Sequence, residues 1–374
     1  MRLYEYESKE ILKEYGLSIP RGIVISRDHP EEIEQQDLNP PLVLKAQVPV
    51  GGRGKAGGII KVKNVEEAKR QLLSLFDKNI NGYAVQKILL EEEILADREL
   101  YLSLSINRQE KSYSLVAGAL GGIDIEEIAK SKPDTILKLS ISPLRLINNF
   151  DVLAISNHLS VPMVRIDPIV RQLFSIAVEL DAELVELNPF VIVGNTSVIL
   201  DAKIIIDDSA LFRHPLLNEL PPRGKTKEEE EAARIGLSYV SLNGNIGIIG
   251  NGAGLTMATM DLLQSKGGHP ADFLDVGAGA KSDIFRKSIH LLMKNDRVKV
   301  IFVNIFGGLT RGDEVAKGII EALGSEPPKK PIVVRLAGTN AIEGGELLRK
   351  NGVSAYSSPL EAAVSAVSRV GGTP

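Results

Sequence analysis

One local pattern occurs four times in the last third of the sequence: a short apolar run, then a glycine-bearing turn, then a stretch with helical spacing. The apolar runs cover residues 245–250, 272–276, 298–305 and 332–336. Strands that alternate with helices in this way favour a parallel sheet with helices on both faces. The pattern therefore predicts an α/β fold for this region. It also places the turns at the carboxyl edge of the sheet, where such sheets bind ligands.

The residues before this region mix helices and strands without the same alternation. Helical spacing of apolar residues predicts a helix over 8–15, capped by Ser8, and another over 65–76. Predicted strands lie at 42–46, 58–62, 83–90, 99–106, 184–187 and 198–200. Two regions with different orders of predicted strands and helices indicate at least two domains.

The pattern of predicted secondary structure changes near Pro221-Pro222-Arg223-Gly224. A charged run over 225–231 follows and is predicted to begin a helix. We place the domain boundary between about Pro222 and Asn243. The predicted division is a domain over 1–222 with a smaller subdomain at about 21–97, a linker or helix over 223–243, and the α/β domain over 244–374.

Composition disfavours several classes of function. A net charge of −4 gives no basic field to attract nucleic acid or anionic lipid, and no apolar stretch approaches the roughly 20 residues that span a bilayer. The absence of cysteine excludes disulfides, thiolate metal ligands and a cysteine nucleophile. The charged first residues lack the apolar core of a signal peptide. We therefore expect a cytoplasmic protein without nucleic-acid or membrane partners.

The stretch Gly51-Gly52-Arg53-Gly54-Lys55-Ala56-Gly57-Gly58 combines five glycines with two cations. A loop of this kind can close over a polyphosphate, because glycine permits close backbone approach and the cations neutralise charge. It is not a Walker A loop, because no hydroxyl residue follows the lysine. The alternative is a long hairpin connection between two strands.

Three charged residues near this loop could share its ligand. Lys45 ends an apolar strand and would point into the same cleft, although an edge-strand lysine that discourages aggregation is the alternative. Glu91 ends one predicted strand and Glu99 begins the next, so their carboxylates could accept hydrogen bonds from a ribose or a base. The run 91–93 could equally be a solvated turn.

A pair of oxygen ligands is expected near residues 186–201. Glu186 and Asn188 share one face of a strand, because side chains alternate along it, and Pro189 is expected to end the ladder. Asp201 follows the next strand, and an antiparallel hairpin turning at 194–196 would bring it near Asn188. Such a pair suits Mg²⁺, which takes few protein ligands. A structural Asn–Asp hydrogen bond is the alternative.

The four glycine turns of the last third could form an anion or acyl site. Asn251-Gly252-Ala253-Gly254 and residues 306–311 each precede a helix whose free N–H groups can hold a carboxylate or phosphate. Arg311 could add a bidentate clamp. The other turns lie at 275–279 and 337–340. Any one turn could be a plain strand–helix connection, whereas four together favour a ligand site.

Taken together, these motifs resemble the succinyl-CoA synthetase beta-subunit family. The motifs that match in order and spacing are the glycine loop 51–58, Glu99-Leu100-Tyr101-Leu102, Glu186-Leu187-Asn188-Pro189, residues 251–255 and Asn304-Ile305-Phe306-Gly307-Gly308. The resemblance implies an ATP-grasp domain followed by a flavodoxin-like CoA-ligase domain. It also implies the tricarboxylic acid cycle reaction in which succinate, CoA and a nucleoside triphosphate give succinyl-CoA, a nucleoside diphosphate and phosphate.

The resemblance also assigns roles to single residues. It implies nucleotide-binding residues at Lys45, Gly52, Arg53, Gly54, Glu91, Ile94 and Glu99, and one Mg²⁺ per subunit at Asn188 and Asp201. It places Glu186 beside a phosphorylated histidine, and it implies substrate binding by Asn251, Gly308, Leu309, Thr310 and Arg311.

The phosphorylated histidine is expected on a partner. None of the histidines, at 29, 158, 214, 269 and 290, falls in a matching motif. The resemblance implies an alpha subunit that supplies this histidine and most of the CoA site, in a heterotetramer or a heterodimer, and activity only with that partner.

Other functions remain open at this stage. ATP is expected over GTP, although no base contact is identified. The alternative hypotheses are a related ligase for another acid such as malate, a stand-alone ATP-grasp carboxylate–amine ligase, and a non-enzymatic nucleotide-binding subunit. The glycine-turn domain argues against the second, and the presence of Lys45, Asn188 and Asp201 argues against the third.

Overall fold

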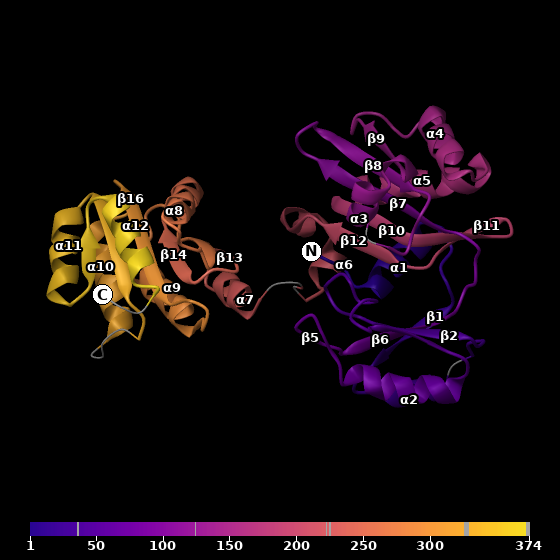
Figure 1. Ribbon diagram of the computed structural model, residues 1–374, viewed down its shortest axis with the longest axis horizontal. Coiled ribbons are helices and arrows are strands. Elements are labelled where there is room, and N and C mark those ends of the chain that lie inside the picture. The colour runs from indigo at the N-terminus through magenta and orange to yellow at the C-terminus, as the bar shows by residue number, and fades with distance from the viewer. Residues whose placement is uncertain (36, 124, 222, 224–225, 325–328, 372–374) are drawn as a thin grey trace. The chain divides into compact units, whose positions relative to one another are not determined.

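The computed structural model describes residues 1–35, 37–123, 125–221, 223, 226–324 and 329–371. Internal contacts divide the chain into two compact units, Met1–Gly224 and Lys225–Pro374 (Figure 1). Pro222, at the predicted domain boundary, and residues 224–225, at the start of the predicted charged helix, lie outside the described residues. Within those described, no helix is long and apolar enough to cross a membrane.

The first unit contains a small antiparallel sheet in the order β1-β6-β2-β3. Its strands are β1 (Gly22–Ser26), β2 (Leu42–Ala46), β3 (Ile59–Val62) and β6 (Lys87–Glu92). Helix α2 (Val65–Phe76) lies along one face of this sheet (Figure 1) and is capped by Asn64. Its bounds are those of the helix predicted over 65–76. The neighbouring short elements are η1 (Pro30–Gln35), β4 (Asn79–Ile80) and β5 (Tyr83–Ala84). The predicted strand over 83–90 is thus two strands, because Tyr83–Ala84 pairs with β4 instead.

The larger sheet of the first unit is also antiparallel, in the order β11-β10-β7-β8-β9, with β12 paired to β10. Its strands are β7 (Glu99–Asn107), β8 (Ser112–Gly118), β9 (Ile136–Ile141), β10 (Ala182–Val193), β11 (Thr196–Ile199) and β12 (Ala202–Ile206). The helical elements around it are α1 (Glu5–Glu14), α3 (Ile125–Ser131), η2 (Pro133–Thr135), α4 (Asn149–Leu159), α5 (Met163–Glu179), η3 (Asp208–Arg213) and α6 (Pro215–Asn218). The first unit therefore combines these two sheets with the short β4–β5 pair.

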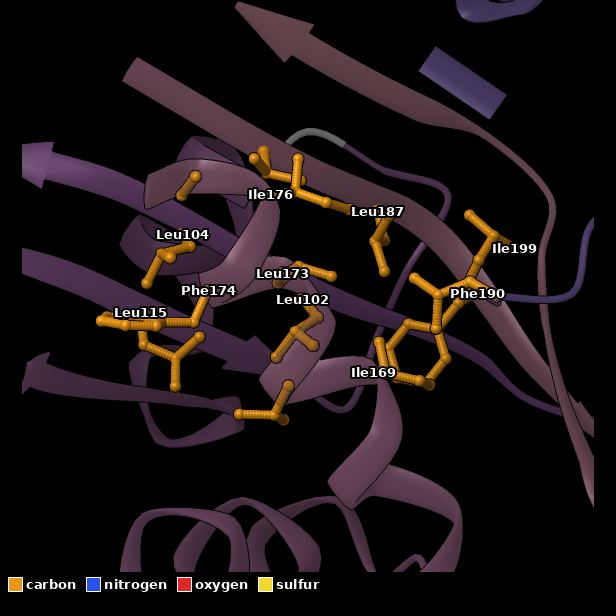
Figure 2. Close-up of a cluster of buried hydrophobic side chains, with 14 of the residues drawn as sticks. Leu102, Leu104, Leu115, Ile169, Leu173, Phe174, Ile176, Leu187, Phe190 and Ile199 are labelled. Carbon is orange, nitrogen blue, oxygen red and sulfur yellow. The ribbon is translucent and has the colours of Figure 1, made fainter. Parts of the chain in front are cut away.

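Alternating leucines hold the larger sheet to its helices. Leu102 and Leu104 project from the same face of β7, and they meet the stripe of Ile169 and Leu173 on α5 (Figure 2). Phe190 of β10 closes the same cluster and is completely buried. This core fixes β10, which carries two of the expected site residues, Glu186 and Asn188.

Two local predictions in the first unit are wrong. Helix α1 begins at Glu5, with Tyr4 as its cap, whereas Ser8 lies inside the helix and donates from its hydroxyl to the Tyr4 carbonyl at 3.0 Å. Pro189 does not end its ladder. It lies within β10 at a bulge, where Asn188 and Pro189 together face a single residue of β7, between the pairs Leu187↔Leu102 and Phe190↔Leu100.

The second unit is built on a six-stranded sheet in the order β13-β15-β14-β16-β17-β18. Its strands are β13 (Ser238–Ser241), β14 (Ile246–Gly250), β15 (Asp272–Asp275), β16 (Val300–Gly307), β17 (Ile332–Gly338) and β18 (Ser354–Tyr356). Its helices are α7 (Lys227–Arg234), α8 (Ala253–Ser265), α9 (Ser282–Lys294), α10 (Gly312–Leu323), α11 (Ala341–Lys350) and α12 (Pro359–Ser368). All neighbouring strands are parallel except β13, which runs antiparallel to β15.

Separate apolar clusters cover the two faces of this sheet. Phe285 of α9 and Ile319 of α10 belong to one cluster, and Leu263 of α8 and Ala363 of α12 belong to the other. Helices therefore pack on both faces, which confirms the predicted α/β fold. Because β14 to β17 are parallel, the glycine turns that follow them all lie at one edge.

Candidate functional site

A cavity of about 690 Å³ lies in the first unit, within the size range of small-molecule sites. Its wall is formed by the glycine loop, by β10 and by the segment around Asp201. Of the predicted site residues it includes Gly52, Arg53, Gly54, Glu186, Asn188 and Asp201. The structure thus brings together residues that lie more than a hundred positions apart in the sequence.

The glycine loop folds into turns against its own small sheet. Gly52 and Gly57 adopt positive φ angles of 74° and 69°, a conformation that glycine adopts without a Cβ penalty. The amide of Gly58 donates to the Arg53 carbonyl at 2.8 Å. Lys55 remains 75% exposed and lies 3.6 Å from Glu127 of α3. Both cations of the loop line the cavity, but Arg53 is largely buried whereas Lys55 is largely exposed.

A cluster of six charged side chains lies against this cavity. Its members are Glu5, Lys9, Lys45, Arg53, Glu91 and Asp201. Three are acids and three are bases, so their formal charges balance. Each is at most 26% exposed, and four are at most 10% exposed. Burial of this many charges is tolerated only where every one is paired.

Lys45 is held by two carboxylates beneath the cavity. Its ammonium lies 2.9 Å from Glu5 and 2.9 Å from Glu91, and it donates to the Leu200 carbonyl at 2.5 Å. β2 is an inner strand of its sheet, so the edge-strand interpretation of Lys45 is wrong. Burial lowers the pKa of Lys45, but the neighbouring carboxylates outweigh burial and raise it, so the side chain stays charged.

Glu91 is buried rather than solvated. It is 2% exposed within β6, and Lys9 donates to both of its oxygens, at 2.5 and 2.7 Å. The alternative of a solvated turn is therefore wrong for Glu91. Glu91 does not line the cavity, and its carboxylate forms ion pairs with Lys9 and Lys45.

The remaining predicted nucleotide residues lie outside the cavity wall. Glu99 is exposed at the start of β7, and its carboxylate lies close to Gly122, a residue of that wall. Ile94 is half-buried on the segment between β6 and β7.

The bulge in β10 brings the two predicted metal ligands together. The amide of Asn188 donates to the Asp201 carbonyl at 3.1 Å, and the amides of Leu200 and Asp201 donate to the Pro189 carbonyl at 3.0 and 3.2 Å. This backbone pairing confirms that the hairpin turning at 194–196 places Asn188 beside Asp201. One amide oxygen and one carboxylate at a shared wall fit a hard cation that completes its shell with water and phosphate.

Both of these side chains are already engaged by the chain itself. Arg53 donates to the two oxygens of Asp201, at 3.0 and 2.9 Å. The Asn188 side-chain oxygen accepts from the Gly122 amide at 2.7 Å. Burial and the nearby Glu5 raise the pKa of Asp201 in spite of the surrounding cations. Arg53 therefore binds the carboxylate group that a metal ion would use as a ligand.

Glu186 lies on the same strand as Asn188 and faces the same cavity. Its side chain is 17% exposed and lies 3.7 Å from Lys203, its cross-strand neighbour on β12. A carboxylate in this position can accept a hydrogen bond from a group that enters the cavity.

The four turns of the second unit are tied into one network. The Asn251 amide group donates to the Phe306 carbonyl at 3.0 Å and to the Thr310 hydroxyl at 3.1 Å. The Gly279 amide also donates to the Thr310 hydroxyl, at 3.0 Å, and the Thr339 hydroxyl donates to the Gly308 carbonyl at 3.0 Å. All four predicted turns therefore meet.

Predicted substrate residues in this network differ in exposure. Thr310 is 2% exposed and Leu309 is 78% exposed, and Gly308 is also open to solvent. Arg311 pairs with Asp313 at the start of α10, at 2.8 Å, and this partner holds the pKa of Asp313 down to about 2. The guanidinium is thus directed at a residue of its own chain.

Three residues of these sites were missed by the sequence interpretation. Glu5 and Lys9 are four positions apart on α1, and such a pair usually marks an exposed helix face. Asp275 accepts from the amides of Gly252 and Gly277, at 2.6 and 2.8 Å, and so holds two of the turns. The Asp preceding the Gly-rich turn was a usable signal for Asp275. No local signal distinguished Glu5 and Lys9 from surface residues.

Comparison with known proteins gives two family matches. The ATP-grasp domain family matches residues 2–192, and the CoA-ligase family matches residues 249–370. A protein of Ignicoccus hospitalis named as succinate–CoA ligase [ADP-forming] subunit beta is 45% identical over 372 residues, covering 98% of both chains. One of the same name from Pyrobaculum arsenaticum is 46% identical over 379 residues, covering 98% of this chain and 99% of that one.

A solved structure supports the same fold. ATP citrate lyase from Methanothrix soehngenii, in complex with citrate and coenzyme A, superposes with a TM-score of 0.69 at 20% identity. The alignment covers 98% of this chain and 99% of that chain. At this identity the likeness concerns the fold alone.

Proposed function

The chain belongs to the family of ADP-forming succinate–CoA ligase beta subunits, and from this premise we propose that its first unit binds a magnesium nucleotide and its second unit binds succinate. An alpha subunit would supply the CoA site and a histidine that is phosphorylated in turn. Together the subunits would convert succinate, CoA and ATP into succinyl-CoA, ADP and phosphate.

The observation that supports the nucleotide site is the cavity itself. The Gly52–Gly54 segment, Asn188 and Asp201 all line it, and Lys45 lies in the charged cluster beneath it. Glycine amides and cations on one side, and oxygen ligands on the other, are what a metal-bound polyphosphate requires. A magnesium ion held by Asn188 and Asp201 would neutralise charge on the phosphates.

The chain's own residues would then position the terminal phosphoryl group. Arg53 and the loop amides would bind its oxygens, and Lys45 would hold positive potential behind them. Glu186 would accept a hydrogen bond from the partner's histidine and so orient the nitrogen that attacks phosphorus. The phosphoryl group would move from ATP to this nitrogen, and ADP would leave.

In the second unit, the network of turns would hold the acid. Open amides at Gly308 and Leu309 would bind a succinate carboxylate, and Asn251 and Thr310 would fix the turns that present them. Arg311 would release Asp313 and bind the carboxylate of the ligand in its place. The names of the relatives favour succinate over malate and ATP over GTP.

The test is to prepare the chain alone, and together with its alpha subunit, and to supply ATP, CoA and either succinate or malate. Succinyl-CoA should form only with the pair and only with succinate. Full turnover by this chain alone would contradict the two-subunit mechanism, and faster turnover with malate would change the assigned acid.

A further inference from the structure

The N-terminal segment joins the two sheets of the first unit at the edge of the cavity. Leu3 donates to the Ile204 carbonyl at 3.1 Å, and the Ile204 amide donates to the Ser8 hydroxyl at 3.2 Å, so α1 is fastened to β12 of the larger sheet. The Tyr6 amide donates to the Gln47 side chain at 3.2 Å, just beyond the end of β2 in the smaller sheet. Helix α1 and the residues before it are therefore hydrogen-bonded to the larger sheet and to the end of β2 in the smaller one.

Glu5 stands in the first turn of this helix with its carboxylate buried. One oxygen lies 2.9 Å from Lys9 and 2.9 Å from Lys45, and the other lies 2.8 Å from Arg53. The side chain is 1% exposed. A single carboxylate thus contacts cations from three segments, namely α1, β2 and the glycine loop.

The other acids of the cluster have different sets of partners. Glu91 contacts Lys9 and Lys45, and Asp201 contacts Arg53. Glu5 is the member that contacts both Lys45 and Arg53, the two cations of the proposed nucleotide site. Burial acts to raise the pKa of Glu5, but Lys45, Lys9 and Arg53 outweigh it and hold that pKa well below its ordinary value. Glu5 is therefore an anion at neutral pH.

Lys45 and Arg53 differ in how far they depend on Glu5. Without Glu5, Lys45 would still be held by Glu91 and the Leu200 carbonyl. Among the residues that the structure describes, the Arg53 side chain would keep Asp201 and a 3.2 Å bond to the Ala46 carbonyl. A bound metal would compete for Asp201, so in the loaded site Glu5 would be the carboxylate left to hold Arg53.

We infer that Glu5 is a positioning residue of the nucleotide site, which sets the place of Lys45 and Arg53 relative to each other across the two sheets. The inference rests on the proposed function, because it presumes that these cations meet a nucleotide. Glu5 belongs to the cavity wall, but its carboxylate is taken up by Lys9, Lys45 and Arg53, so its role would be exerted through these cations. Its effect is on the geometry of transfer, because a misplacement of about 1 Å in a reacting group costs about 10²-fold in rate.

The test separates binding from transfer with Glu5→Gln, which keeps the shape and removes the charge. With the alpha subunit present, single-turnover transfer of labelled phosphate from Mg-ATP to the partner's histidine should slow by about 10²-fold. The dissociation constant of Mg-ATP should change by less than about fivefold, because both cations are retained even though their positions shift. A purely structural role predicts unchanged transfer by the folded protein.

Glu7→Gln is the matched control. Glu7 lies on the same helix and is 7% exposed, and its ion partner is Arg223, which is outside the cluster. Both variants should lower the unfolding temperature, but only Glu5→Gln should slow transfer. Equal transfer rates in the two variants would overturn the inference.

A double variant keeps the test informative if Glu5→Gln folds poorly. Glu5→Gln with Lys9→Gln leaves Glu91 and Asp201 against Lys45 and Arg53, so the charges balance again. The unfolding temperature should recover toward the wild type while transfer remains slow, because the link to Arg53 is still missing. Recovery of the transfer rate would show that charge balance is the whole role of Glu5. If the wild-type pair itself transfers no phosphate from Mg-ATP, the proposed function fails and the positioning role falls with it.

Discussion

The two units bury ionisable side chains in opposite ways. In the first unit, six charges lie together and each has a partner of opposite sign. In the second, Asp272 is completely buried and accepts from the Ile248 amide, at 3.1 Å, and within the described residues it forms no ion pair. Burial raises the pKa of Asp272 well above its ordinary value, so this carboxyl is favoured in its neutral form.

The difference agrees with the ligand proposed for each unit. A polyphosphate with its metal needs several fixed charges, and fixed charges in a dry site must be paired while the site is empty. The carboxylate of a bound acid can instead be held by backbone amides at the start of a helix. These amides carry only partial charges, and the turns around them satisfy those charges when the site is empty. The first unit should therefore be sensitive to loss of any one charge, and the second to loss of neutral hydrogen bonds.

The largest effect is expected for Lys45→Ala. The change leaves Glu5 and Glu91 with fewer cations, and breaking a buried pair costs about 3–5 kcal/mol of unfolding free energy. Loss of a cation behind the transferred phosphoryl group should slow labelling of the partner's histidine by about 10²–10³-fold. Denaturant unfolding and single-turnover labelling measure the two effects.

Lys61→Ala is the control for Lys45→Ala, because Lys61 lies on the adjacent strand β3 and is 70% exposed. It should change neither quantity by a comparable amount. Labelling by Lys45→Ala at the wild-type rate would show that the nucleotide site lies elsewhere.

In the second unit, Thr310→Val should cost about 1–3 kcal/mol of unfolding free energy, because the donors of Asn251 and Gly279 lose their shared acceptor. The KM for succinate should rise as the turns loosen. Ser265→Ala, at an exposed position of α8, is the control for stability. An unchanged unfolding midpoint for Thr310→Val would remove the contrast between the two units.

Arg53→Gln should have opposite effects on two ligands. Since Arg53 covers both oxygens of Asp201, its removal should raise the affinity for Mn²⁺ alone by about tenfold, which corresponds to about 1.4 kcal/mol, and weaken binding of Mg-ATP. Electron paramagnetic resonance of Mn²⁺ and calorimetry with Mg-ATP measure the two. Lys55→Gln, on the same loop, should leave the affinity for Mn²⁺ alone unchanged. If Mn²⁺ binds equally to the wild type and Arg53→Gln, Arg53 does not compete with the cation.

The smallest effect is expected for Asp272→Asn, and it should depend on pH. An acid whose folded pKa is raised binds its proton more tightly when folded, so its contribution to stability falls as pH rises from the unfolded pKa to the folded one. The amide keeps an acceptor for Ile248 without this loss. Thermal unfolding should show a higher midpoint for the variant at pH 7 and a smaller difference near pH 4. A difference independent of pH would mean that Asp272 is not the buried neutral acid.

Local patterns were sufficient for much of this protein. The period of apolar residues determined α2 and the alternating strands and helices of the second unit, because these elements depend on which residues share a face. Parallel strands then place their turns at one edge. The hairpin turning at 194–196 was also predictable, and it was enough to place Asn188 beside Asp201.

Contacts between distant segments were decided only by the tertiary structure. Glu5 meets Lys45 across 40 positions, Lys9 meets Glu91 across 82, and Arg53 meets Asp201 across 148. In the sequence, Glu5 and Lys9 have the spacing of an exposed helix face, and Glu91 stands in a run of acids. Their pairing follows from the packing of α1 between two sheets, which buries the charges and brings those of opposite sign into contact. Local patterns therefore determined the elements and the residue types of the site, whereas packing decided which charges hold it in place.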